Sequence, residues 1–286
     1  MDLHDHGLAS DLEMMHQLAA ERRQVLRWLL AGAASLPLIS CGGGSDAGST
    51  AVADSATGNA GTGTVATPVT GACTVIPEET GGPYPADGTN TNGGSIVNVL
   101  NQSGVVRSDI RASFNGATGV AAGVPLTIQL QLLNASGSCA TLAGYAIYLW
   151  HCDREGLYSL YSSGVTGQNY LRGVQETDAS GKLGFTTIFP GCYAGRMPHV
   201  HFEVYPSLAK AASAANRIKT SQFTFPLATL NEAYTASGYT ASVRNLAQIS
   251  YATDNVFSDG TSLQMASVTG NATDGYVVTL TVAVNG

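Results

Sequence analysis

The chain has 286 residues, of which 44% are hydrophobic but only 12% are charged, about half the usual charged share of a globular protein. Its net charge of −7, with only 13 lysines and arginines, argues against a nucleic-acid-binding protein, which normally carries a basic patch. With 34 glycines and few charges, the composition excludes a coiled coil or a charged helical bundle and suits short β-strands joined by turns.

Residues 1–40 have the features of an export signal. Arg22 and Arg23 precede a short apolar stretch at 28–39, which is too short to span a membrane. The paired arginines resemble a twin-arginine signal, and the segment that ends at Cys41 resembles a lipoprotein processing box. We therefore expect an exported protein, periplasmic or on the cell surface, with a lipid anchor on Cys41. The alternative is an ordinary amphipathic N-terminal helix.

Residues 41–72 consist largely of Gly, Ser, Thr and Ala and contain almost nothing that can build a core. This composition predicts a flexible tether. One folded domain is expected to follow, at 73–286.

Short strands separated by turns dominate the predicted domain. Several runs alternate apolar and polar residues or are continuously apolar, as strands with one or two buried faces do. The strand candidates are 124–132, 145–150, 185–189 and 278–282. Asp178 to Gly181 predict a turn, and the only plausible helix covers 208–218. The fold class is therefore predicted as all-β, a β-sandwich of mostly antiparallel strands with long loops and a short helix.

Two histidines two residues apart are the first sign of a site. On a strand, His199 and His201 project from the same face, with Glu203 next along, while Val200 and Phe202 face a core. Two imidazoles on one rigid strand form half of a metal site. The alternative interpretation is a pair of surface histidines.

The remaining residues limit which metal such a site would take. A closed zinc site needs four Cys or His ligands, and beyond residue 40 the only other histidine is His151. A ferrous site that uses His199, His201 and Glu203 is one option. Tyrosinate is another, because the chain has 12 tyrosines and a phenolate is a hard anionic donor suited to Fe(III).

Four segments resemble, in order and spacing, the motifs of the intradiol ring-cleavage dioxygenases. The segments are Glu79–Tyr84, Trp150–Ser159, Thr177–Tyr193 and Arg196–Phe202. The similarity covers roughly 77–225, and the core is more similar to the protocatechuate-type subunit than to the catechol-specific branch, whose long helical N-terminal region this chain lacks.

The resemblance implies a role for particular residues. It implies that a non-haem Fe(III) ion is held by Tyr158, Tyr193, His199 and His201. It implies catalytic roles for Arg196, beside the ligands, and for Gln222, near the substrate. Pro83 and Tyr84 match a segment that borders the substrate pocket. Tyr161 is a competing candidate for the position of Tyr158.

One departure from the family concerns the loop between the second tyrosine and the histidines. Only five residues separate Tyr193 from His199, and they include Ala194 and Gly195 where ring-cleaving members often carry a longer loop with bulky residues. We expect a more open site.

The implied reaction is cleavage of a small aromatic diol by O₂ between its two hydroxyl-bearing carbons, which gives a muconate-type dicarboxylic acid. Arg196 would stabilise negative charge that develops on the ring. Two alternatives are a cupin-like Fe(II) oxygenase that uses His199, His201 and Glu203, and a lipid-anchored β-sandwich that binds a ligand without catalysis. The sequence does not specify the catechol, and a homo-oligomer is compatible with it.

The cysteines allow one more prediction. If Cys41 carries lipid, four remain: Cys73, Cys139, Cys152 and Cys192. Because free thiols close to ferric iron would compete as ligands or become oxidised, we expect these cysteines to be disulfide-bonded, with the pairing open. The alternative is buried reduced thiols.

Overall fold

The structure, a computed structural model, describes residues 73–286. The predicted signal peptide at 1–40, the tether at 41–72 and the lipid attachment at Cys41 lie outside the described residues. In the described part of the chain, no helix is long and apolar enough to cross a membrane.

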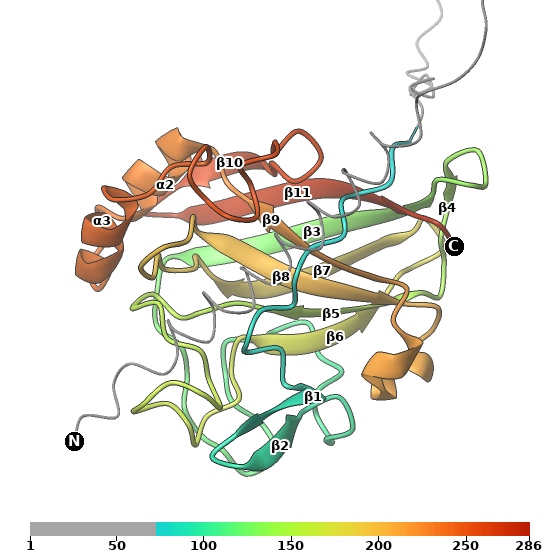
Figure 1. Ribbon diagram of the computed structural model, residues 1–286, viewed down its shortest axis with the longest axis horizontal. Coiled ribbons are helices and arrows are strands. Elements are labelled where there is room, and N and C mark those ends of the chain that lie inside the picture. The colour runs from blue at the N-terminus through green and yellow to red at the C-terminus, as the bar shows by residue number, and fades with distance from the viewer. Residues whose placement is uncertain (1–72) are drawn as a thin grey trace, which may run out of the picture. The chain divides into compact units, whose positions relative to one another are not determined.

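Two β-sheets form the body of this domain (Figure 1). In the five-stranded sheet, β10, β11, β3 and β4 follow one another, and β7 also pairs with β3. Its strands are β3 Pro125–Asn134, β4 Ala140–Thr141, β7 Lys182–Ile188, β10 Ser267–Asn271 and β11 Gly275–Val284. The β11–β3 pair is parallel, whereas the other pairs in this sheet are antiparallel.

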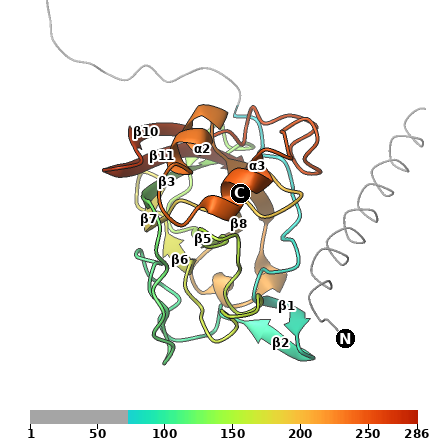
Figure 2. The same cartoon turned by 90° about the vertical axis from the view of Figure 1, so that its left-hand side faces the viewer.

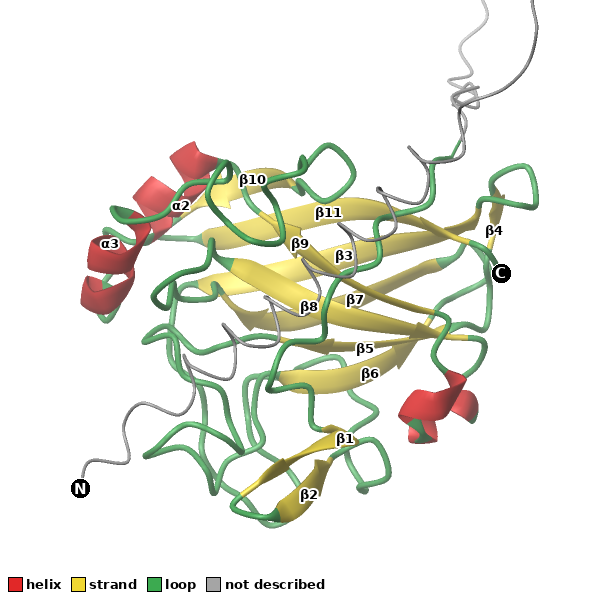
Figure 3. Ribbon diagram, in the orientation of Figure 1, coloured by secondary structure: helices red, strands yellow, loops and turns green. Residues whose placement is uncertain are grey.

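The second sheet has four strands in the order β6-β5-β8-β9, and all of its pairs are antiparallel (Figure 3). Its strands are β5 Ala146–Trp150, β6 Arg172–Glu176, β8 His199–Tyr205 and β9 Lys219–Thr224. A separate hairpin pairs β1 Asp87–Asn92 with β2 Ser95–Asn98. The predicted all-β sandwich is confirmed, and each predicted strand overlaps an observed one.

The main core lies between the two sheets. Alternate residues of β3, such as Ile128, pack there with Val200 and Phe202 of β8, as the period-two pattern predicts. These side chains share one hydrophobic cluster with Phe185 of β7 and Val278 of β11.

The four-stranded sheet is also covered on its other face, which distinguishes it from a simple sandwich. All seven residues of β8 are buried. A second cluster on that face joins Tyr148 and Trp150 of β5 to residues of the covering loops, including Ala86, Val105 and Tyr158. The face that carries His199 and His201 is therefore enclosed by loops.

The helices differ from the prediction. The expected helix at 208–218 is instead two 3₁₀ turns, η1 Lys210–Ala212 and η2 Ala214–Asn216, because Ser213 between them has an extended backbone with φ −147° and ψ 127°. Two short α-helices that the sequence pattern did not indicate, α2 Leu227–Ala233 and α3 Thr240–Leu246, lie near β10 at one end of the sheets (Figure 1 and Figure 2).

The cysteine prediction is only half right. Cys73 and Cys139 form a disulfide, with their Cα atoms 5.7 Å apart. Cys152 and Cys192 are free and buried, which contradicts the expectation that all four are paired. Their thiols contact backbone carbonyls, Cys152 that of Gly191 and Cys192 that of Arg196. Burial raises the pKa of the Cys192 thiol to about 12, so it stays protonated and a poor metal ligand.

Candidate metal centre and active site

Four side chains meet on the enclosed face of the four-stranded sheet. The Nε2 atoms of His199 and His201 lie 3.0 Å apart. The hydroxyl oxygens of Tyr158 and Tyr193 each lie 3.4 Å from Nε2 of His199. Tyr158 and both histidines are almost fully buried. The structure thus brings together the four predicted ligands, and their role as ligands remains a prediction.

Hydrogen bonding fixes the tautomer of His199. Its Nδ1 lies 2.6 Å from the carbonyl oxygen of Met197, which can only accept, so Nδ1 carries the proton and Nε2 presents a lone pair to the cluster. Burial, and next the charge of Arg196, hold the pKa of His199 well below its usual range. Burial also raises the pKa of the Tyr158 phenol. Without a cation, His199 and His201 are therefore neutral imidazoles and Tyr158 is a protonated phenol.

The two tyrosines come from two loops that touch. Tyr158 follows β5, Tyr193 precedes β8, and the loops meet at Gly156, where φ is +89°. A Cβ at Gly156 would lie 3.0 Å from Cβ of Tyr193, so only glycine allows this approach. The carbonyl of Asp153 accepts the N–H groups of both Gly156 and Gly191, which joins the loops.

Helix α3 holds the same two loops from behind. The hydroxyl of Ser242 donates to the carbonyl of Arg154 and accepts the N–H of Cys192. Asn245 donates its side-chain N–H to the carbonyl of Cys192 at 2.7 Å. An element that the sequence pattern did not predict therefore supports the placement of Tyr193.

Tyr161, the competing candidate, points elsewhere. Its hydroxyl donates to Asn90 at 2.6 Å and accepts the N–H of Ala86 at 2.9 Å. These contacts attach the β1–β2 hairpin to the loop that carries Tyr158, so Tyr161 has a role in packing the cover of the site.

The two residues predicted to be catalytic contact each other. Arg196 donates from Nη2 to Oε1 of Gln222 at 2.7 Å. Gln222 stands opposite His201 in the β8–β9 register, and its Nε2 donates to the carbonyl of Thr80 at 2.8 Å. A guanidinium and an amide therefore lie beside the cluster and connect it to the N-terminal segment.

That segment also forms a wall of the site. The ring of Tyr84 lies 5.0 Å from that of Tyr158, centroid to centroid. A Cβ at Gly82 would lie 3.5 Å from Cε1 of His201. The carbonyl of Pro83 accepts a hydrogen bond from Asn90 of the hairpin. The predicted pocket residues are thus close to the cluster, and Gly82 packs next to His201.

The contacts of Glu203 and His151 do not favour either residue as an additional metal ligand. The carboxylate of Glu203 accepts from the Tyr205 hydroxyl at 2.5 Å and pairs with Arg217 at 3.5 Å, so it is engaged outside the cluster. Burial, and next Asp87, raise the pKa of Glu203 to about 8. Both ring nitrogens of His151 are also in contacts, at 2.7 Å from the carbonyl of Cys152 and from the hydroxyl of Thr187.

The donors of the cluster differ from those of metal sites built from His, Cys, Asp and Glu alone. Among residues 73–286, no group of three or more His, Cys, Asp or Glu side chains has a metal-binding arrangement. The cluster has only two donors of these residue types, because its other two donors are tyrosine oxygens. The Nε2 atoms of His199 and His201, 3.0 Å apart, are close enough for both to bind one cation.

The short loop after Tyr193 is open to solvent. Ala194 and Gly195 are exposed, and no described atom lies within 4 Å of a Cβ built at Gly195.

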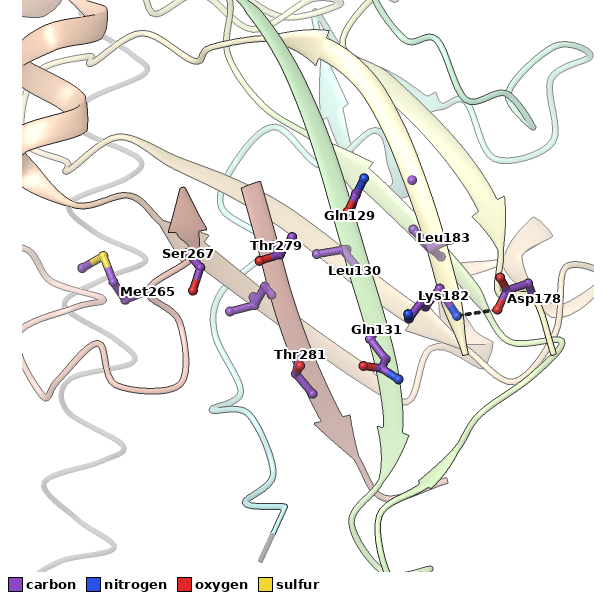
Figure 4. Close-up of a pocket in the computed structure, with 12 residues that line it drawn as sticks. Gln129, Leu130, Gln131, Asp178, Lys182, Leu183, Met265, Ser267, Thr279 and Thr281 are labelled. Carbon is purple, nitrogen blue, oxygen red and sulfur yellow. Dashed lines mark hydrogen bonds between the residues drawn. The ribbon is translucent and has the colours of Figure 1, made fainter. Parts of the chain in front are cut away.

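A separate hollow of about 840 Å³ lies on the outer face of the five-stranded sheet (Figure 4). Polar side chains of β3, β7 and β11 line it, among them Gln129, Lys182 and Thr279. It contains none of the predicted site residues. The cluster is the better candidate for an active site, because the hollow has no convergent reactive groups.

Two residues that the sequence interpretation did not assign a role contact the site. The indole of Trp150 stacks on His201. Asp254, which is fully buried, accepts hydrogen bonds from Arg196 and Met197. Trp150 is the first residue of one of the four family-like segments, which is a usable signal, whereas no local pattern marks Asp254.

Most of the chain is similar to known proteins. Residues 104–219 match the family model described as Dioxygenase. An intradiol ring-cleavage dioxygenase from Tetranychus urticae has 23% identity and a TM-score of 0.56, over 74% of this chain and 95% of that one, which shows the same fold. The dioxygenase domain of a carbohydrate-binding fusion protein from Streptomyces sp. SirexAA-E has 22% identity and a TM-score of 0.45, over 74% and 99% of the two chains.

No curated protein matches the chain. The family match over 104–219, together with the shared fold, confirms the predicted resemblance to the intradiol ring-cleavage dioxygenases and the prediction that the chain is an enzyme.

Proposed function

We propose that the protein uses Fe(III), held by Tyr158, Tyr193, His199 and His201, to cleave a catechol-type ring between its two hydroxyl-bearing carbons with O₂. The product is a muconate-type dicarboxylic acid. The observation that supports this most directly is the meeting of two phenol oxygens and two imidazole nitrogens within 3.0 to 3.4 Å at Nε2 of His199.

The donor set fits ferric iron better than other common ions. Two phenolates are hard anionic donors, and two neutral imidazoles complete a set that carries a charge of −2. An Fe(III) ion held by these four residues would supply a Lewis acid, which the deprotonated diol could chelate through its two oxygens. Met197 fixes His199 in the tautomer that binding requires, through the 2.6 Å contact at Nδ1.

The other residues orient the substrate and exclude water. Arg196 and Gln222 lie on one side of the cluster, where a guanidinium stabilises negative charge developing on the ring. Tyr84 and Gly82 lie on another side, against Tyr158 and His201. The burial of these groups lowers the local dielectric and strengthens each of these interactions.

The test is oxygen uptake by the iron-loaded protein against a panel of catechols, with the products identified. We expect one O₂ consumed per ring and both oxygen atoms in a dicarboxylic product. A product that carries an aldehyde would show cleavage outside the two hydroxyl-bearing carbons and would reject the proposal. Iron-loaded protein without a visible tyrosinate charge-transfer band would reject the proposed ligands.

We also propose that the protein is exported through the twin-arginine signal at 1–40 and anchored by lipid on Cys41, with 41–72 as tether and 73–286 as the catalytic domain. The support is the sequence alone. Replacing Arg22 and Arg23 by lysine should leave the protein in the cytoplasm. Replacing Cys41 by serine should release exported protein from the membrane fraction, and protein that remains membrane-bound would contradict the anchor.

A further inference from the structure

Arg196 is held by a carboxylate that comes from a distant part of the chain. Nε of Arg196 donates to Oδ2 of Asp254 at 3.0 Å, and the two residues are 58 positions apart. The side chains are 6% and 0% exposed. Together with the bond from Nη2 to Gln222, this contact holds two nitrogen atoms of the guanidinium, Nε and Nη2, and so fixes its plane.

The same oxygen atom has a second contact. The backbone N–H of Met197 donates to Oδ2 of Asp254 at 2.6 Å. The carbonyl of Met197 is the acceptor that fixes the tautomer of His199. Asp254 is therefore attached to both Arg196 and the backbone next to a predicted ligand.

Asp254 is itself held rigidly. Its other oxygen, Oδ1, accepts the backbone N–H groups of Val256 at 2.8 Å and Phe257 at 3.1 Å. The ring of Phe257 lies 5.9 Å from the guanidinium carbon of Arg196 and 6.5 Å from the ring of His199. With four donors around one carboxylate, the side chain has a single arrangement, which makes it suitable as a fixed support.

Electrostatics require such a partner. An arginine buried to this degree is costly unless an anion compensates it, and Asp254 is the carboxylate in contact with it among the described residues. Without that anion, Arg196 would keep its bond to Gln222 but lose its ionic partner.

We propose that Asp254 is a positioning residue for the active site, which holds Arg196 in the orientation used in the reaction and holds Met197 so that its carbonyl orients His199. The proposal rests on the proposed function for the role of Arg196. Asp254 lies outside the segment at 104–219 that matches the family model, so this support is contributed by the C-terminal part of the chain.

The test uses the iron-loaded protein with Asp254→Asn, Arg196→Gln, and the double variant. An asparagine must turn its NH₂ either toward the two loop N–H groups or toward Arg196 and Met197, so it cannot satisfy all four donors. For Asp254→Asn we expect kcat per bound iron to fall about 100-fold and iron affinity to fall about tenfold. Arg196→Gln should lower kcat and leave iron affinity within about threefold, because it spares the Met197 contact.

The double variant shows whether Asp254 affects kcat through Arg196. If Asp254 acts on turnover through Arg196, adding Asp254→Asn to Arg196→Gln should change kcat per iron by less than about threefold, while iron affinity still falls about tenfold. The double variant can still test the proposal if the single Asp254 variant does not fold, because it removes both the buried carboxylate and the buried guanidinium. The matched control is Asp274→Asn, at an exposed acid in the β10–β11 turn, which should behave as wild type.

The outcomes separate this proposal from the proposed reaction. An additional 100-fold loss of kcat in the double variant, or an iron affinity equal to that of Arg196→Gln, would overturn the positioning role. If the wild-type protein cleaves no catechol but the iron affinities follow the expected pattern, the reaction is wrong and the support of His199 by Asp254 stands.

Discussion

The indole of Trp150 lies parallel to the imidazole of His201, with ring centroids 4.9 Å apart and an interplanar angle of 2°. The two residues are directly paired in the antiparallel β5–β8 register. Tyr148 continues the stack at 4.9 Å from Trp150. The indole of Trp150 therefore orients the imidazole of His201, a predicted ligand, by stacking on it.

Removing this ring should disturb both stability and iron binding. We expect Trp150→Ala to reduce the free energy of unfolding by about 3–5 kcal/mol, because it opens a cavity among fully buried side chains. Iron affinity should fall about 10-fold to 100-fold as His201 loses its support. Trp150→Phe, which keeps a flat ring, should retain most of the affinity. Urea unfolding and iron titration measure the two effects, and wild-type iron affinity in Trp150→Ala would contradict the role of the stack.

The two neighbouring tyrosines offer a matched pair of substitutions. Tyr158→Phe removes a phenol oxygen at 3.4 Å from Nε2 of His199 and should abolish or shift the visible band and stop turnover. Tyr161→Phe removes a hydroxyl that contacts Asn90 and Ala86 and should cost about 1 kcal/mol of stability with the band unchanged. The reverse result, a band that depends on Tyr161, would show that the wrong tyrosine has been assigned.

Much of the fold and cluster could be predicted because the relevant signals are local. Period-two alternation revealed β3 and β11, and the two-residue spacing put His199 and His201 on one face of β8. The family motifs marked Tyr158 and Tyr193. All of these patterns are contained within a few residues of the chain.

The parts that were missed depend on contacts between distant segments. Asp254 meets Arg196 across 58 positions, and Ser242 of α3 contacts Cys192 across 50. Neither has a local pattern, because each requires knowing which loops touch. The cysteine prediction failed for a related reason: sequence proximity to Tyr158 and Tyr193 does not tell in which direction the thiols of Cys152 and Cys192 point.

The contact between the tyrosine loops can be tested at one glycine. Gly156 and Gly164 have nearly the same φ, +89° and +86°, but only Gly156 has neighbours within 4 Å of a Cβ. Either substitution by alanine should cost about 1–2 kcal/mol for the left-handed backbone. Gly156→Ala should in addition push Tyr193 away and lower iron affinity about tenfold. Equal iron affinities in the two variants would show that the close approach is not needed.

The four cysteines of the described domain should differ in reactivity. Cys152 and Cys192 are buried, and burial raises the pKa of both thiols, so a thiol reagent should modify neither in the native protein. After denaturation without reductant, peptides that contain these two should be labelled, and peptides with Cys73 and Cys139 should not.

Replacing Cys73 and Cys139 by serine should lower the free energy of unfolding by about 4 kcal/mol, because the crosslink closes a loop with a sequence separation of 66 and restricts the unfolded chain. Neither cysteine of the disulfide is adjacent in sequence to a predicted ligand. Iron affinity and the visible band should therefore be unchanged in this variant. Urea unfolding measures the free energy of unfolding of this variant. Peptide mapping by mass spectrometry shows which of the four cysteines are labelled. Labelling of all four cysteines before reduction would contradict the disulfide.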